Sequence, residues 1–380
     1  MKTLGIAIVL ALATQSMGCG SSDSPSQVTA SRFALVANHG SDNVSVYAID
    51  PTTGALAPVA GSPFSAGRLP RCVAVTPSGS FAYVANAGID TQPGGVSIFA
   101  VNPTSGALTP VGGSLMAAGE RPWVVAVHTS GRFVYVASGL DSSPRNGDLR
   151  AFAVDRATGA LTPAGSPFSL GKAPYSVAVH PSGMFAYVLS NGEVSTYSIN
   201  STTGALSQIG GSPVQSGSGS DTASLAIHPS GAYAYVANEF DGSISMFSVD
   251  KTTGALSHLA GSPLPAGTFP NSVAIHPSGA FALVSDFWDN DVQVYSINRS
   301  TGALAAVTSS NLGGAYYPHW LAVSSTGAFA YVANYPRLGS GNVSAYTVDG
   351  ATGSLTPVSG SPFGSPLAAE AEPDSIALAP

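Results

Sequence analysis

The stretch Pro174–Leu206, PYSVAVHPSGMFAYVLSNGEVSTYSINSTTGAL, decides the fold of this chain. It contains three short runs with strand character: SVAVH, MFAYVL and VSTYSIN. The first two are rich in Val, Ala, Phe and Tyr, and the third alternates apolar and polar residues. The turn sequences PSG, NG and TG follow the three runs, and a fourth run, LSQIG, begins at Leu206. The stretch therefore predicts a four-stranded meander.

The same unit recurs about every 50 residues along the chain. Its signature, T/S-G-A/S-L, occurs seven times, with the glycines Gly54, Gly106, Gly159, Gly204, Gly254, Gly302 and Gly353. Four strands per repeat of this length are typical of propeller blades, whereas a solenoid has a shorter period and capping ends. We therefore expect an all-β protein, a seven-bladed β-propeller built of four-stranded antiparallel blades.

The two ends of the chain are expected to complete each other. Aligned by their apolar cores, the innermost strands begin at Arg71, Trp123, Tyr175, Ala223, Asn271, His319 and Asp374. The last copy ends the chain, whereas the first repeat, which starts at Arg32, has no inner strand of its own. We expect the C-terminal strand to pair into the blade built from residues 32–62, which closes the ring and hides two sheet edges.

Length and composition indicate how many domains the chain forms and which partners are excluded. The 380 residues are 44% hydrophobic and 9% charged, and the formal net charge is -7. A closed propeller uses residues 32–380 as one domain. No basic run occurs, so we expect no nucleic-acid partner, and the propeller is expected to be a monomer.

The N-terminus is predicted to be a targeting segment. Lys2 precedes an apolar run from Leu4 to Ala13, and Cys19 follows a small residue. This order resembles a bacterial lipoprotein signal. It implies a signal peptide over residues 1–18, lipidation of Cys19 and a polar tether over residues 19–31. The protein would then be exported and held in the cell envelope by its lipid anchor only. The alternative is an ordinary secretory signal with a chance cysteine.

The motifs PSGxFAYVAN, VSVYAID-PTTGAL and AGSPF resemble those of the seven-bladed lactonase family, typified by the propeller-type 6-phosphogluconolactonase. They are also similar to those of YVTN-repeat surface proteins. The resemblance covers nearly all of residues 32–380. It implies the propeller fold and, as a candidate activity, hydrolysis of a sugar-type lactone without a metal or an organic cofactor.

The resemblance also implies an active site at one mouth of the central channel. The family places there a Pro-Arg-His run from an inner strand and a Glu that follows Asn in the next loop. Asn238-Glu239 matches the second element, which makes Glu239 a candidate catalytic residue. The inner strand before it, SDTASLAIHP, has neither Arg nor His at the places where the family has them. Pro70-Arg71 resembles the first element, although Cys72 follows, and Phe287 stands where the family tends to have Arg.

The residues that begin the inner strands are the main candidates for a site, because these positions line one mouth of a propeller channel. His319, Asp374 and Arg71 belong to three consecutive blades. We predict that His319 activates water as a general base, Asp374 orients or stabilises it, and Arg71 binds the carbonyl oxyanion. The alternative is a solvated mouth with unrelated side chains.

Ligand-binding roles are predicted for four further residues near the same mouth. Trp123, Tyr175 and Trp320 offer flat apolar surfaces to a sugar ring, and Asn271 belongs to the same ring of positions.

Two other groups are tested as metal ligands. Four histidines occupy one equivalent position on different blades, too far apart to share an ion, which favours a structural role: His128, His180, His228 and His276. Asp286, Asp289 and Asp291 suggest calcium, but their spacing matches no known loop and Asp is an ordinary turn residue. We expect no metal.

Two function classes remain open from the sequence. One is a lactonase-like hydrolase that acts on a small-molecule lactone or another carbohydrate. The other is a non-catalytic binding or scaffold propeller of the cell envelope, whose partner is an envelope protein.

Overall fold

The computed structural model describes residues 32–89, 91–112, 115–139, 147–217, 223–311, 316–336, 341–364 and 372–380. The predicted signal peptide, Cys19 and the tether lie outside these residues and stay predictions. Within the described residues, the one helix is the short 3-10 helix η1 (His39–Ser41), and no helix is long and apolar enough to cross a membrane.

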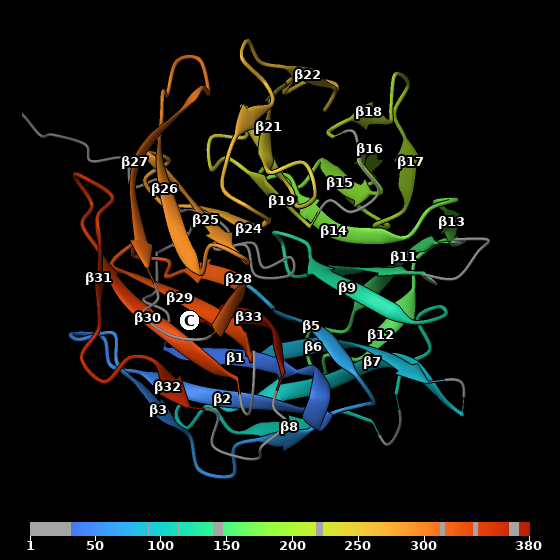
Figure 1. The fold of residues 1–380 in the computed structure, drawn as a ribbon. Coiled ribbons are helices and arrows are strands. Elements are labelled where there is room, and N and C mark those ends of the chain that lie inside the picture. Colours follow the sequence, from blue (N-terminus) through green and yellow to red (C-terminus); the bar gives the residue numbers. More distant parts are fainter. Residues whose placement is uncertain are drawn as a thin grey trace, which may run out of the picture.

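Seven separate antiparallel sheets follow each other around a ring, as predicted (Figure 1). The inner strands are β33 (Pro373–Ala379), β5 (Pro70–Val75), β9 (Pro122–Val127), β14 (Pro174–Val179), β19 (Ser224–Ile227), β24 (Pro270–Ile275) and β28 (Tyr316–Val323). The second strands are β1 (Phe33–Asn38), β6 (Phe81–Ile89), β10 (Phe133–Ser138), β15 (Phe185–Ser190), β20 (Tyr233–Asn238), β25 (Phe281–Asp286) and β29 (Phe329–Pro336). In this order they belong to blades 1 to 7.

The outer half of each blade repeats in the same order. The third strands are β2 (Asn43–Ile49), β7 (Gln92–Val101), β11 (Asp148–Val154), β16 (Glu193–Ile199), β21 (Ser243–Val249), β26 (Asp291–Ile297) and β30 (Asn342–Val348). The fourth strands are β3 (Leu56–Pro58), β8 (Leu108–Pro110), β12 (Leu161–Pro163), β17 (Leu206–Gln208), β22 (Leu256–His258), β27 (Leu304–Asn311) and β31 (Leu355–Pro357).

Five blades carry one short strand that the repeat pattern did not predict. Each pairs with the third strand of its blade as the chain returns toward the next inner strand. They are β4 (Phe64–Ser65), β13 (Phe168–Ser169), β18 (Val214–Gln215), β23 (Leu264–Pro265) and β32 (Phe363–Gly364). Two-residue strands carry too little apolar periodicity to be seen in a sequence.

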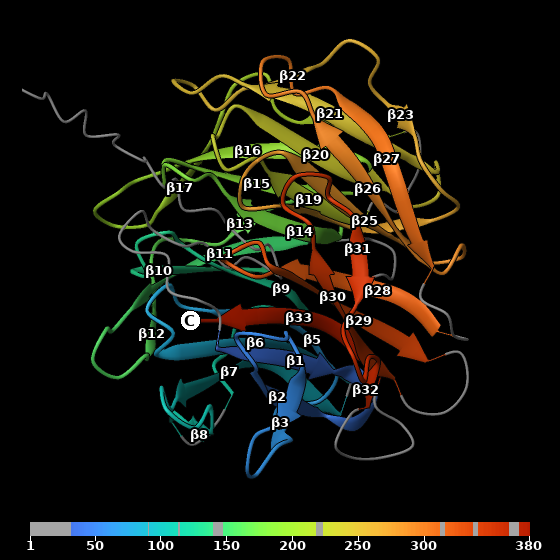
Figure 2. The same ribbon diagram turned by 90° about the vertical axis from the view of Figure 1, so that its left-hand side faces the viewer.

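The C-terminal strand closes the ring, which confirms the prediction. β33 pairs antiparallel with β1, from Phe33 opposite Ala379 to Asn38 opposite Pro373, and all seven of its residues are buried. The backbone N–H of Arg32 donates to the carbonyl of Ala379 over 2.7 Å. Figure 2 shows β33 beside β1 although they lie at opposite ends of the sequence.

The T/S-G-A/S-L signature marks the contact between neighbouring blades. Gly204 has φ +75, and its carbonyl accepts a hydrogen bond from the hydroxyl of the buried Tyr135 of the preceding blade. A Cβ on Gly204 would lie 2.3 Å from the ring of Phe133. Four other blade junctions use the same tyrosine-to-glycine bond. The signature therefore records how blades pack, because the turn must approach an aromatic ring closely.

Substituting Gly204→Ala tests this contact. The positive φ costs about 1–2 kcal/mol for a residue with a Cβ, and overpacking against Phe133 adds about 1–3 kcal/mol. We expect the free energy of unfolding, measured by denaturant titration, to fall by both amounts. Gly211→Ala is the matched control: its φ is +81, but a Cβ there meets nothing within 4 Å, so it should lose the backbone cost alone. Equal losses would contradict the packing argument.

The four equivalent histidines hold adjacent blades together. In each, Nε2 lies 2.9–3.0 Å from a glycine carbonyl of the next blade, and Nδ1 accepts the N–H of the serine two residues ahead. A carbonyl only accepts, so Nε2 carries the proton. Burial lowers the pKa of each histidine below the ordinary 6.5. Their predicted structural role is confirmed.

A second set of bonds joins the inner strands. A small polar side chain on one strand accepts the backbone N–H of the next: Cys72 from Val125, Ser176 from Leu225, Ser224 from Val273, Ser272 from Leu321 and Ser375 from Val73. These contacts fix the spacing of the strands around the channel, and with it the positions of the side chains at their beginnings.

Candidate functional site

A β-bulge places a side chain at the start of six inner strands. In each, the residue after a proline has no partner on the second strand, while the residues on either side do; the proline is the first residue of the strand except in β28, where it is the third. The bulged residues are Arg71, Trp123, Tyr175, Asn271, His319 and Asp374. Proline has no N–H to give to the ladder, and a bulge turns a side chain out of its usual alternation. The Pro-X pair is a signal in the sequence that marks this ring.

These side chains surround a cavity of about 170 Å³ at the mouth of the channel. It is lined by Arg71, Trp123, Val124, Tyr175, Ala223, Glu239, Asn271, His319, Trp320 and Asp374. The structure therefore brings together all eight residues that were predicted to form the site. Their catalytic and binding roles stay predictions.

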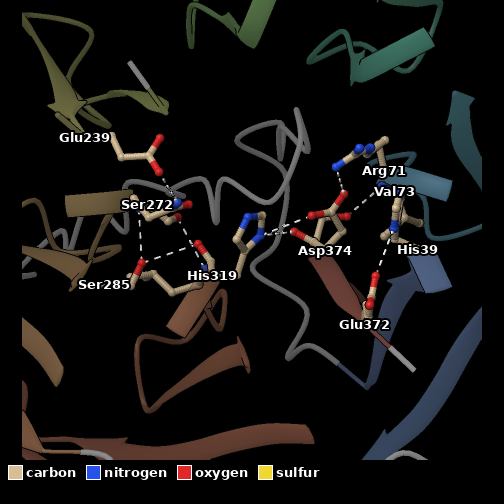
Figure 3. A network of polar contacts seen from close by, with 12 residues as sticks. His39, Arg71, Val73, Glu239, Ser272, Ser285, His319, Glu372 and Asp374 are labelled. Atoms are coloured by element: carbon tan, nitrogen blue, oxygen red, sulfur yellow. Dashed lines mark hydrogen bonds and ion pairs between the residues drawn. The ribbon is translucent and has the colours of Figure 1, made fainter. Parts of the chain in front are cut away.

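Asp374 lies between His319 and Arg71 (Figure 3). Nδ1 of His319 is 2.9 Å from the backbone carbonyl of Asp374 and 3.3 Å from its Oδ1. Because a carbonyl oxygen only accepts, Nδ1 carries the proton, and Nε2 is left as the basic ring nitrogen. The other carboxylate oxygen, Oδ2, is 3.2 Å from Nη1 of Arg71. The carboxylate of Asp374 in blade 1 therefore contacts both neighbouring blades, Arg71 of blade 2 and His319 of blade 7. Its side chain is only 7% exposed.

The contacts continue from Arg71 into an aromatic wall. Its guanidinium lies 4.8 Å from the ring centroid of Trp123, which meets Tyr175 edge to face at 5.8 Å. The Nε of Arg71 and the indole N–H of Trp320 are buried and have no acceptor among the described residues. Buried donors without a partner cost free energy, so this wall has unused capacity to donate to a ligand.

The opposite side of the cavity carries an acceptor. The side-chain amide of Asn271 donates to Oε1 of Glu239 over 3.4 Å, which joins blades 5 and 6. Among the described residues that line the cavity, Arg71 is the one always-charged cation, while Asp374 and Glu239 are both carboxylates. The cavity is therefore polar without being basic.

Three residues near His319 and Asp374 were missed by the sequence reasoning. The carboxylate of Glu372 lies 3.2 Å from Nδ1 of His39 and contacts Tyr335. Burial and these carboxylates raise the pKa of Tyr335 to about 12, so its phenol keeps its proton. The ring of Tyr335 is 6.2 Å from that of His319. His39 and Tyr335 each follow a repeated second-strand motif, FALVAN or FAYVAN, and Glu372 precedes a Pro-X pair. The repeat therefore marks their positions, but it does not show that the three side chains meet.

The three aspartates near residue 290 belong to one hairpin, in agreement with the turn alternative: Asp286 ends β25, Asp289 lies in the turn and Asp291 begins β26. Oδ2 of Asp289 accepts the N–H of Thr268 over 2.8 Å, and residues 287–290 are turn. Burial raises the pKa of Asp286 to about 7 and that of Asp291 to about 6. Across the described residues, no group of three or more His, Cys, Asp or Glu side chains is placed to hold a metal ion.

A larger hollow, of about 610 Å³, lies between blades 1 and 2. Its lining is mostly Ser, Gly, Pro and apolar residues, and its two charged side chains, Asp42 and Arg68, are paired with each other. Its described lining includes no histidine that could act as a base, whereas the channel mouth has His319, so the channel mouth is the better candidate site.

The fold and the cavity define a seven-bladed propeller with a polar pocket at one mouth. The family described as lactonase, 7-bladed beta-propeller, matches residues 11–124, 89–190 and 184–369. The chain belongs to this family.

Solved structures agree with this fold. A protein named as a 6-phosphogluconolactonase from Bacteroides uniformis is 18% identical, with a TM-score of 0.76 over 91% of this chain and 98% of its own. A periplasmic gluconolactonase from Pseudomonas aeruginosa is 19% identical, with a TM-score of 0.73 over 92% and 99%. No curated protein sequence matches the chain.

Proposed function

We propose that the protein hydrolyses a neutral sugar lactone in the cavity at the channel mouth. The contact of Nδ1 of His319 with Asp374 carries the proposal, because it leaves Nε2 as a base, while the guanidinium of Arg71 contacts the same carboxylate from the other side. The family and the names of its structural neighbours support a lactone as the substrate class.

The reaction follows from these roles. Nε2 of His319 takes a proton from water, and the hydroxide oxygen bonds to the lactone carbonyl carbon. Arg71 stabilises the negative charge that develops on the carbonyl oxygen, while Asp374 stabilises the imidazolium. The bond from the carbonyl carbon to the ring oxygen then breaks. The ring oxygen takes the proton back from His319, which gives the hydroxy acid and restores the base.

The charges of the site favour an uncharged substrate. Arg71 is already paired with Asp374, and Glu239 adds a second carboxylate. A phosphate group would bring negative charge next to these carboxylates, and the described part of the cavity wall has no unpaired arginine or lysine to receive it. Flat aromatic surfaces and acceptors at their edges suit the hydroxylated ring of a sugar.

The test measures acid release from three substrates: glucono-δ-lactone, galactono-lactone and 6-phosphogluconolactone. A pH indicator follows the release, and the rate of spontaneous hydrolysis is subtracted. We expect a neutral lactone to have the highest kcat/KM. His319→Gln should lower kcat at least about 100-fold, the usual effect of losing a general base. His258→Gln is the matched control, because His258 is exposed on the outer strand β22. Equal rates in the two variants, or no turnover of any lactone, would overturn the proposal.

A second candidate is ligand binding without catalysis. The inner strand of blade 5 favours it, because Ala223 stands on the ring and neither Arg nor His occurs in the preceding residues of SDTASLAIHP. Calorimetric binding of a lactone or its acid that is lost in Trp123→Ala, without turnover, would support this candidate instead.

A further inference from the structure

A cluster of five aromatic side chains lies next to the cavity on blades 5 to 7. We call it the aromatic rim: Phe240, Phe269, Phe287, Trp288 and Tyr317. The rings form one connected set. Phe287 stacks on Tyr317 at 4.4 Å with 10° between the planes, and Trp288 meets both edge to face at 5.1–5.3 Å. Phe269 joins Trp288 to Phe240 at 5.9 and 4.6 Å.

Part of this rim faces solvent. Trp288 is 53% exposed and Phe240 is 59% exposed, which makes them two of the four exposed large hydrophobic residues in the described part of the chain. The other two, Met184 and Val307, belong to no aromatic cluster. Exposed apolar surface gathered in one place marks a binding surface more often than scattered residues do.

The rim is continuous with the cavity. Phe240 follows the cavity residue Glu239 directly, and the ring of Phe287 is 6.4 Å from that of His319. Phe269 precedes Asn271 by two residues, and Tyr317 precedes His319 by two. Phe240, Phe269, Phe287 and Tyr317 are therefore each close, in sequence or in space, to a residue that lines the cavity.

Polar groups border the exposed rings. Asp241 follows Phe240, and Asp289 follows Trp288, with both aspartates exposed. The contact from Thr268 to Oδ2 of Asp289 fixes the turn and leaves Oδ1 to accept from a ligand. An acyl or aryl group has no hydrogen-bond donor for these carboxylates. A pyranose ring has both an apolar face for Trp288 and hydroxyl donors for the aspartates.

The size of the cavity also indicates that a ligand longer than one sugar ring would extend over the rim. Its volume of about 170 Å³ is below the roughly 300–1,000 Å³ of ordinary small-molecule sites. It has room for one sugar ring, so the rest of a longer ligand must leave through the mouth. On the side of blades 5 to 7, that path crosses the aromatic rim.

We propose that the aromatic rim is a second saccharide subsite, which binds the sugar attached to the lactone ring. The substrate class is then the lactone at the end of an oligosaccharide, formed when the terminal aldose is oxidised. This inference rests on the proposed function for the lactone ring, and it makes a separate claim about the neighbouring sugar.

The test compares the lactone of a β-1,4-linked glucose disaccharide with glucono-δ-lactone. We expect the kcat/KM of the disaccharide lactone to be higher by about tenfold, the effect of one further aromatic contact of about 1.4 kcal/mol. In the double variant Phe240→Ala/Trp288→Ala this ratio should fall to near one. Met184→Ala is the control, since it removes an exposed side chain at a different turn and should keep the ratio.

A binding measurement separates the two proposals. Calorimetry with the β-1,4-linked glucose tetrasaccharide, which has no lactone, should show binding that the double variant loses. Binding without turnover of any lactone supports the rim and overturns the proposed function. A ratio near one in the unmodified protein, together with no tetrasaccharide binding, overturns the rim and leaves the function standing. A preference for the aryl lactone dihydrocoumarin that depends on Trp288 also overturns the proposal that the aromatic rim binds a saccharide.

Discussion

Removal of residues 373–380 is expected to abolish the folded state. These residues form β33, which pairs with β1 at six residue pairs and buries Ile376 and Leu378 between blades. Each such side chain contributes about 1.5–3 kcal/mol, and the lost backbone bonds add about 1 kcal/mol each. The sum consumes most of the roughly 5–15 kcal/mol that stabilises a typical domain. Without β33, circular dichroism and denaturant titration should show no cooperative transition.

A permuted chain separates the loss of closure from the loss of sequence. Residues 372–380 and a short glycine linker are inserted between residues 31 and 32, and the chain ends at residue 371. Arg32 and Ala379 already share a hydrogen bond of 2.7 Å, so the moved strand can pair with β1 as a hairpin. We expect the cooperative transition to return. A truncated chain that unfolds at the same denaturant concentration as the intact one would show that the ring does not depend on this strand.

Asp286→Asn is expected to stabilise the protein strongly above neutral pH. The carboxyl of Asp286 is fully buried, its Oδ2 has no hydrogen-bond partner within the described part of the chain, and burial raises its pKa from 3.8 to about 7. Between these values the folded state holds a proton that the unfolded state releases, so stability falls as pH rises from 3.8 to about 7. A shift of about three pKa units corresponds to roughly 4 kcal/mol, an upper bound for the gain at pH 8.

The other blades show why asparagine fits this position. Asn38, Asn86, Asn238 and Asn334 occupy it, and each donates from Nδ2 to a serine hydroxyl on the third strand. In blade 6 the matching residue is Gln293, whose side-chain oxygen is the acceptor that an amide at position 286 would find. We expect the gain of Asp286→Asn in free energy of unfolding to be large at pH 8 and small at pH 4. Asn238→Asp should do the reverse, with a loss at pH 8. A gain that is independent of pH would mean that ionisation of Asp286 is not its cause.

The buried histidines act in the opposite direction and serve as an internal reference. Their pKa values are lowered by burial, so the unfolded state binds more protons, and stability falls as pH drops below the ordinary 6.5. Asp286→Asn leaves these four residues in place. The acid loss should therefore persist in the variant, and the difference between the two proteins isolates the carboxyl, together with its neighbours Asp289 and Asp291.

The sequence was sufficient for the ring and for its closure because both depend on repeated local signals. The glycine of each T/S-G-A/S-L turn is required by an aromatic ring of the preceding blade, so the signature survives in all seven copies. The order of the blades then determines that His319, Asp374 and Arg71 are neighbours. The bulge at each Pro-X pair, which turns these side chains into one cavity, was not recognised, although its signal is present.

The rest of the site depends on contacts that no repeat records. The aromatic rim is assembled from three blades, and its residues have no aromatic counterparts at the same turns of the other blades. The contact of Glu372 with His39 and Tyr335 likewise joins the last segment of the chain to the first blade and to blade 7. Burial of Asp286 could not be predicted from the sequence for a different reason, because an aspartate next to a turn is usually solvated.

The antiparallel pairing of β33 with β1 also determines from which side the chain leaves the ring. Asp374, the second residue of β33, lies at the cavity, and Ala379, at the far end of that strand, lies opposite Phe33. Residue 32 therefore emerges on the side remote from His319. A propeller held to a membrane by the segment before it would stand with the side remote from His319 toward the lipid. Its pocket would then open outward, where a polymer approaching from the surrounding medium can reach it.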